Sequence, residues 1–156
     1  MRKQTVMALL LACQPLYAHG ITATAGISRS GKRCQPVFTT ALALQGKAGS
    51  LVGRFSIPAR WALAVHDDHF RALREHHGLG VALAFGWQEE HWSLLVEGSS
   101  MRLWTRGDGV SLLYAMTLIP GIKAIPCCSF LLPLSVEWHS GVTTLHTSFG
   151  VHVELP

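Results

Sequence analysis

The residue of this chain best placed to do chemistry is His19, because of what precedes it. Residues 1–18 are typical of an export leader that ends in Leu16-Tyr17-Ala18, and cleavage after Ala18 would give His19 a free α-amino group. An amine and an imidazole on one residue can chelate copper, with a further histidine as the next ligand. A periplasmic copper-binding protein is therefore one alternative function. The sequence does not single out the next ligand from His66, His69, His91, His139, His146 and His152.

Cysteines are the second set of reactive side chains. Cys34, Cys127 and Cys128 remain after such cleavage, and in an oxidising compartment we expect Cys34 to form a disulfide with one of the other two. Free thiols, or zinc binding by the adjacent pair with a histidine, are the alternatives. Cys13 follows Leu10-Leu11-Ala12 in a stretch that resembles the lipobox of bacterial lipoproteins. A lipoprotein anchored at Cys13 is thus a further alternative.

Enzyme motifs do not appear in this sequence. There is no G-x-S-x-G elbow, no phosphate-binding glycine loop and no H-E-x-x-H pair, and the adjacent Glu89 and Glu90 project in different directions. The 13 Lys and Arg residues are scattered and form no basic run, which argues against nucleic-acid binding. We therefore predict a protein that is not an enzyme and carries no cofactor, and no metal unless His19 binds copper.

The first 18 residues predict the localisation. A basic start, Met1-Arg2-Lys3-Gln4, precedes a short apolar run and a small-residue exit, as in a secretory signal peptide. No later apolar stretch is long enough for a transmembrane helix. We therefore expect a secreted, exported chain with a signal peptide at 1–18, an N-terminal extension at 19–30 and one domain at 31–156.

The sequence predicts that the elements which position these side chains are β-strands along the whole chain after the signal peptide. Runs of alternating or β-branched residues follow one another, and turn signals such as Glu97-Gly98-Ser99 and Pro120-Gly121 separate them. Short strands at a spacing of about 8–12 residues predict an all-β sandwich or barrel. Asp68 could cap a short helix over 69–77 in a crossover. The expected strands are 21–27, 37–45, 51–57, 60–66, 80–85, 91–96, 101–105, 110–118, 130–138, 142–146 and 151–155.

The tryptophans lie in or beside these strands. Core packing is the simplest interpretation of Trp87, Trp92, Trp104 and Trp138. A surface for a carbohydrate or host-surface ligand is the alternative. Apolar residues make up 49% of the chain and charged residues only 14%, which suggests that another molecule covers some apolar surface.

Two stretches resemble subunits of chaperone–usher fimbriae of Gram-negative bacteria. The first begins at Ile21-Thr22-Ala23-Thr24-Ala25, and the second is Leu132-Pro133-Leu134-Ser135-Val136-Glu137-Trp138 followed by Gly141 and Val142. The resemblance implies an incomplete immunoglobulin-like β-sandwich, whose partners are other fimbrial subunits and a periplasmic chaperone. Residues Ile21, Ala23, Ala25 and Ile27 would be the face of a strand donated to a neighbouring subunit. The expected function is then a structural or adhesive subunit of a surface fimbria, or pilus, that passes through the periplasm.

Overall fold

The computed structural model describes residues 18–30, 33–63, 76–105 and 109–155. Long alternating runs in these ranges form nine antiparallel strands. The described part of the chain contains no helix that could cross a membrane. The strands are β1 (Ala18–Ser30), β2 (Arg33–Ala48), β3 (Leu51–Ala62), β4 (His76–Gln88), β5 (Trp92–Thr105), β6 (Gly109–Ile125), β7 (Cys128–Leu131), β8 (Leu134–His139) and β9 (Val142–Leu155).

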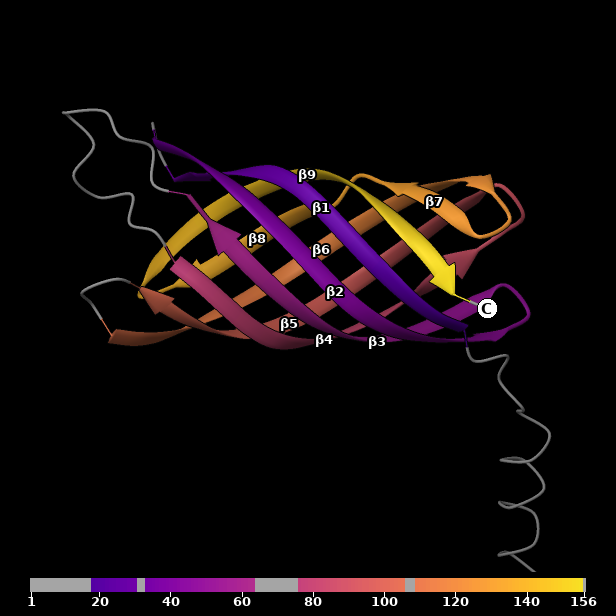
Figure 1. The fold of residues 1–156 in the computed structure, drawn as a ribbon, viewed down its shortest axis with the longest axis horizontal. Coiled ribbons are helices and arrows are strands. Elements are labelled where there is room, and N and C mark those ends of the chain that lie inside the picture. Colours follow the sequence, from indigo (N-terminus) through magenta and orange to yellow (C-terminus); the bar gives the residue numbers. More distant parts are fainter. Residues whose placement is uncertain (1–17, 31–32, 64–75, 106–108, 156) are drawn as a thin grey trace, which may run out of the picture.

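These strands close into a single ring (Figure 1). Each strand from β1 to β6 pairs with the next, and β9 returns to pair with β1. The short strands β7 and β8 both lie between β6 and β9, and Leu132 and Pro133 separate them. The amide of Leu132 still bonds to the carbonyl of Pro120, and the carbonyl of Pro133 still accepts a bond from Ser148. The two pieces therefore act as one position in an eight-strand antiparallel barrel.

The pairing register fixes the tilt of the strands. A line of paired residues that leaves β1 at His19 returns to β1 at Arg29, ten positions further along. Eight strands with a shear of ten residues tilt by roughly 40° from the barrel axis and leave an interior just wide enough for side chains. The line runs through Leu44, Phe55, Leu83, Gly98, Met116, Val136 and Leu145.

The two ends of the barrel differ in their connections. We call one the turn end, where residues 49–50, 89–91 and 126–127 link the strands and where β1 begins and β9 finishes. The opposite end, here the far end, carries the connections 31–32, 63–75, 106–108 and 140–141. Ser140 and Gly141 both have positive φ, which matches the twist of a tight hairpin between β8 and β9. In Figure 1 the turn end is on the right, beside the C-terminus.

The predicted immunoglobulin-like sandwich is therefore wrong, because the sheet closes on itself. The N-terminal extension is also not free: Ile21 pairs with Leu42 of β2 and with Val153 of β9. This strand completes its own barrel, so assembly into a fimbria by donor-strand addition is wrong, together with the fimbrial subunits and the chaperone as partners. The predicted helix falls mostly outside the described residues, and its last two positions, His76 and His77, lie in β4.

Candidate functional site

The outer face of the barrel is apolar on every side. Side chains alternate between the lumen and the outside, and β4 shows the pattern clearly: Leu79, Leu83 and Phe85 are 51%, 55% and 66% exposed. The residues between them on β4 are small, with Gly80, Ala82, Ala84 and Gly86 facing the lumen. Each strand of the ring carries large apolar side chains that are exposed on the outside. On β4, large apolar side chains therefore point outward and small ones inward, the reverse of a strand that packs on a core.

Aromatic side chains gather in a row on the outer face near the far end. Trp61 of β3 pairs with His77 of β4, which pairs with Trp104 of β5. The rings of His77 and Trp104 stack with centroids 5.6 Å apart. Tyr114 of β6 pairs with Trp138 of β8 further round. This aromatic row extends over several neighbouring strands at one level of the barrel.

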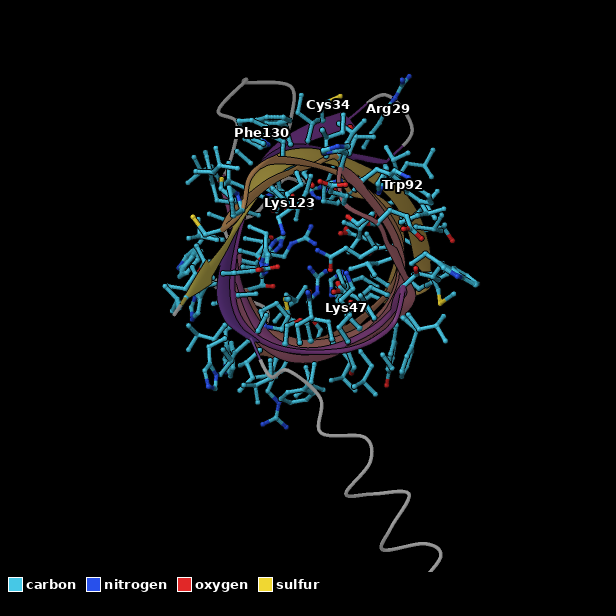
Figure 2. The ribbon with its side chains drawn as sticks, turned by 90° about the vertical axis from the view of Figure 1, so that its right-hand side faces the viewer. Arg29, Cys34, Lys47, Trp92, Lys123 and Phe130 are labelled. Carbon is cyan, nitrogen blue, oxygen red and sulfur yellow. The ribbon has the colours of Figure 1, made fainter. Side chains whose placement is uncertain are left out.

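A second aromatic group lies at the turn end. Trp87 and Trp92 flank the 89–91 turn, and both are at least half exposed. Phe130 of β7 lies outside the ring at the same end (Figure 2). On β5, Trp104 lies twelve positions after Trp92. At about 3.3 Å per residue and a tilt near 40°, the two aromatic levels are about 30 Å apart along the axis.

The lumen is polar and contains charged pairs. Figure 2 shows nitrogen and oxygen atoms gathered inside the ring. Arg60 of β3 reaches Glu137 of β8 with two bonds, Nη1 to Oε1 at 2.5 Å and Nη2 to Oε2 at 3.0 Å. The hydroxyls of Ser28 and Thr144 donate to the same Oε2 at 3.4 and 3.3 Å. Four strands are thereby tied together by hydrogen bonds to one carboxylate.

A second pair lies nearer the turn end. Arg54 of β3 lies 3.3 Å from Glu97 of β5, measured from Nη2 to Oε2. Thr117 and Ser135 share a bond of 2.9 Å between their hydroxyl oxygens. Both arginine pairs and both hydroxyls line one cavity of about 100 Å³. The cavity is large enough for several water molecules, and the Nε atoms of both arginines are buried there with no protein partner.

Buried apolar side chains form two clusters in the lumen. One cluster is Val52, Ala84, Leu95, Ile119 and Leu131, and the other is Met101, Leu103, Leu113 and Ala115. The lumen is thus filled by side chains, with apolar clusters around a polar middle. This arrangement can hold a barrel rigidly in shape.

The residues predicted to form a donated strand lie on one face, and this face is the outside of the barrel. Ile21, Ala23, Ala25 and Ile27 all point to the outside of β1. His19 is exposed at the start of the same face. Among the described residues, no three His, Cys, Asp or Glu side chains could hold a metal ion together. The absence of such a group among these residues does not test copper binding by His19 through its amine and imidazole, which stays a prediction, and Cys13 lies outside the described residues.

The predicted disulfide is not formed. Cys34, Cys127 and Cys128 are all free thiols. Cys34 pairs with Arg29, whereas Cys128 pairs with Val153, the partner of Ile21. Arg29 and Ile21 are eight residues apart on one strand, about 26 Å. A disulfide requires Cα atoms within about 7 Å, so the register keeps Cys34 away from the Cys127–Cys128 pair.

The tryptophans are not core residues. Trp61, Trp87, Trp92 and Trp138 are between 43% and 56% exposed on the outer face. A sequence signal for this arrangement exists in β3, where Arg54 and Arg60 alternate with Phe55, Ile57 and Trp61. Charged residues on the face opposite the large apolar ones indicate a polar interior and an apolar exterior.

Comparisons with known structures support the fold. The chain resembles the crystal structure of Neisserial surface protein A (NspA), with a TM-score of 0.58 at 10% identity, over 89% of this chain and 97% of that one. It also resembles a de novo designed transmembrane β-barrel, with a TM-score of 0.50 at 7% identity, over 87% and 95% of the two chains. No family model matches the sequence, and no curated protein matches it. At these identities the likeness establishes an eight-strand barrel fold and nothing more.

Proposed function

We propose that this chain is an integral β-barrel protein of a bacterial outer membrane. In this proposal the apolar outer face contacts lipid acyl chains, and the two aromatic levels lie at the two membrane interfaces. The observation that carries the proposal is an apolar surface that surrounds a closed ring on all sides. A water-soluble monomer rarely exposes apolar patches beyond a few hundred Å², whereas a membrane requires such a surface.

The dimensions of the barrel support a membrane location. The two aromatic levels are about 30 Å apart, close to the thickness of a bilayer hydrocarbon core. Outer-membrane barrels carry an outward apolar band about 25 Å tall, flanked by aromatic girdles. A closed ring leaves no unpaired strand edge within that band, as lipid demands. The two structural neighbours are a surface protein and a designed transmembrane barrel, which agrees with this interpretation.

The connections suggest an orientation. Barrels of this class have short turns on the periplasmic side and longer connections outside the cell. The turn end of this barrel has only two- or three-residue turns, while residues 63–75 join β3 to β4 at the far end. The turn end would then face the periplasm and the far end the cell exterior. The predicted signal peptide at 1–18 would export the chain, and residues 1–17 lie outside the described residues.

The role that fits this architecture is structural and non-enzymatic. Arg60 and Glu137 bridge the lumen and apolar clusters pack beside them, which favours a scaffold over an open pore. Such a scaffold would present the far end at the cell surface. A carbohydrate or host-surface ligand for that end stays a prediction from the sequence.

The test is refolding of the urea-unfolded chain in two environments, followed by flotation and far-ultraviolet circular dichroism. We expect β structure to form in lipid vesicles and the protein to float with them after a urea wash. In buffer without lipid or detergent we expect aggregation, because nothing covers the outer face. A soluble monomeric β-fold in buffer, or release from vesicles by the wash, would contradict the proposal.

A further inference from the structure

We propose that the outer face of β5 near the far end binds the phosphate of an anionic lipid headgroup, and that Arg102 makes the contact. This inference rests on the proposed function, because it places the barrel in a bilayer. It names a chemical class of ligand for one position on a surface that is otherwise apolar.

The position of Arg102 is the first observation. Its neighbours on β5, Met101 and Leu103, are 4% and 1% exposed, so strand alternation directs the exposed Arg102 to the outside. The residues paired with it are Leu79 of β4 and Leu112 of β6, both about half exposed. The side chain of Arg102 therefore leaves the sheet between two leucines that would face lipid.

The outer face is almost free of charge, which makes this arginine distinctive. Among the strand residues whose side chains the structure describes, only two charged ones point to the outside of the barrel, Arg29 and Arg102. Arg102 forms no hydrogen bond or ion pair within the described structure, whereas Arg54 and Arg60 in the lumen are each paired with a glutamate. A cationic side chain at a lipid boundary costs free energy unless its charged group reaches water or an anion.

The surroundings of Arg102 place its head at the headgroup level. Trp104 lies two residues further toward the far end on the same face, and its ring stacks on His77. Tyr114 lies diagonally across on β6, since its pairing partner is Ser100. Trp and Tyr mark the level of headgroups in membrane proteins. The flexible stem of an arginine spans the short distance from its Cα to that level, and its planar fork matches phosphate oxygens.

The experiment measures lipid binding to the folded, full-length protein by native mass spectrometry. The protein is released from neutral detergent micelles after titration with phosphatidylglycerol, which is anionic, or with zwitterionic phosphatidylcholine. We expect the first phosphatidylglycerol molecule to bind more tightly than the first phosphatidylcholine molecule. We expect Arg102→Gln to weaken that binding about fivefold and Arg102→Lys to retain most of it.

Lys47→Gln is the matched control, because it removes one positive charge at the turn end. We expect this variant to bind phosphatidylglycerol as the wild type does. Unchanged binding in Arg102→Gln, an equal loss in Lys47→Gln, or no preference for phosphatidylglycerol in the wild type would each overturn the inference. Vesicle flotation of the same preparations separates this failure from failure of the proposed function, because a barrel that floats but lacks lipid preference contradicts only the Arg102 site.

Discussion

The outer and inner faces of this barrel follow opposite rules, although they alternate along the same strands. On β4, Leu79, Leu83 and Phe85 point out, while Gly80 and Ala84 point into the lumen. On the outside, every strand carries large apolar side chains, and charged residues are rare. Inside, polar pairs and small residues share the space with two apolar clusters. The difference is the one expected of a barrel in an apolar solvent, as the proposed membrane location requires, with the polar groups placed in the interior.

Among interior residues, Glu137 is the one whose substitution should reduce the stability of the barrel most. Glu137 and Arg60 are 2% and 5% exposed, and replacing Glu137 with alanine leaves the Arg60 charge buried without its partner. We expect Glu137→Ala to lower the free energy of unfolding by about 3–5 kcal/mol. Urea titration of the protein in lipid vesicles, followed by circular dichroism, measures this loss.

A double variant provides the control for that prediction. Replacing Arg60 with methionine and Glu137 with leucine removes both charges, so it should recover most of the lost stability. If Glu137→Ala unfolds at the wild-type urea concentration, the lumen is wetter and less constrained than the structure indicates.

The exterior should be most sensitive to charge in the middle of the strands. Leu83 of β4 pairs with Phe55 and Gly98, midway between the two aromatic levels. We expect Leu83→Arg to destabilise the inserted barrel by about 2–4 kcal/mol, because the charge lies at the bilayer centre. Leu51→Arg at the turn end should cost only about 0–1 kcal/mol. The same vesicle titration compares them, and equal costs at the two depths would contradict a membrane location.

Sequence patterns predicted the strands well but not how far they extend. Runs 51–57 and 60–66 were expected as two strands, yet β3 continues through Pro58. The pairing of β3 with β4 skips Ile57 and Pro58, so the ladder tolerates the missing amide. Gly98 and the Pro120-Gly121 pair likewise lie within β5 and β6 rather than in turns. A closed barrel holds each strand from both sides, which overrides local turn signals.

The choice of face could not be decided from alternation alone. A period of two shows which residues share a face but does not show which face meets the solvent. Ile21, Ala23, Ala25 and Ile27 were grouped correctly and then assigned to a partner's groove instead of to the barrel exterior. The contact between Arg60 and Glu137 joins residues 77 positions apart, which no local pattern reveals.

Glycines give a matched test of the two faces. A Cβ on Gly86 would collide with the backbone oxygen of Leu94, whereas a Cβ on Gly98 would meet no atom within 4 Å. We expect Gly86→Ala to cost about 1–3 kcal/mol in overpacking. Gly98→Ala should be neutral or stabilise the barrel by up to about 1 kcal/mol. Thermal unfolding in detergent measures both, and a tolerated Gly86→Ala would show that β4 and β5 are less closely packed than described.

The smallest expected change in stability is for the replacement of two threonines, one on each face of the barrel. Thr117 shares a buried hydrogen bond of 2.9 Å with Ser135, so Thr117→Val should cost about 1 kcal/mol by leaving that serine unpaired. Thr40 is exposed on the outer face of β2, and Thr40→Val should leave stability unchanged or raise it slightly. Urea midpoints in vesicles distinguish the two variants. A larger loss for Thr40→Val than for Thr117→Val would reverse the assignment of the faces.

The proposed lipid-facing exterior is tested most directly by intermolecular nuclear Overhauser effects between acyl chains and methyl groups of the folded protein. We expect strong effects from acyl-chain protons to the outward methyl groups of Leu83, Val96 and Met116, and none to the lumen methyl groups of Leu95 and Ala115. Effects from water to the outward methyl groups, with acyl-chain contacts absent there, would contradict it.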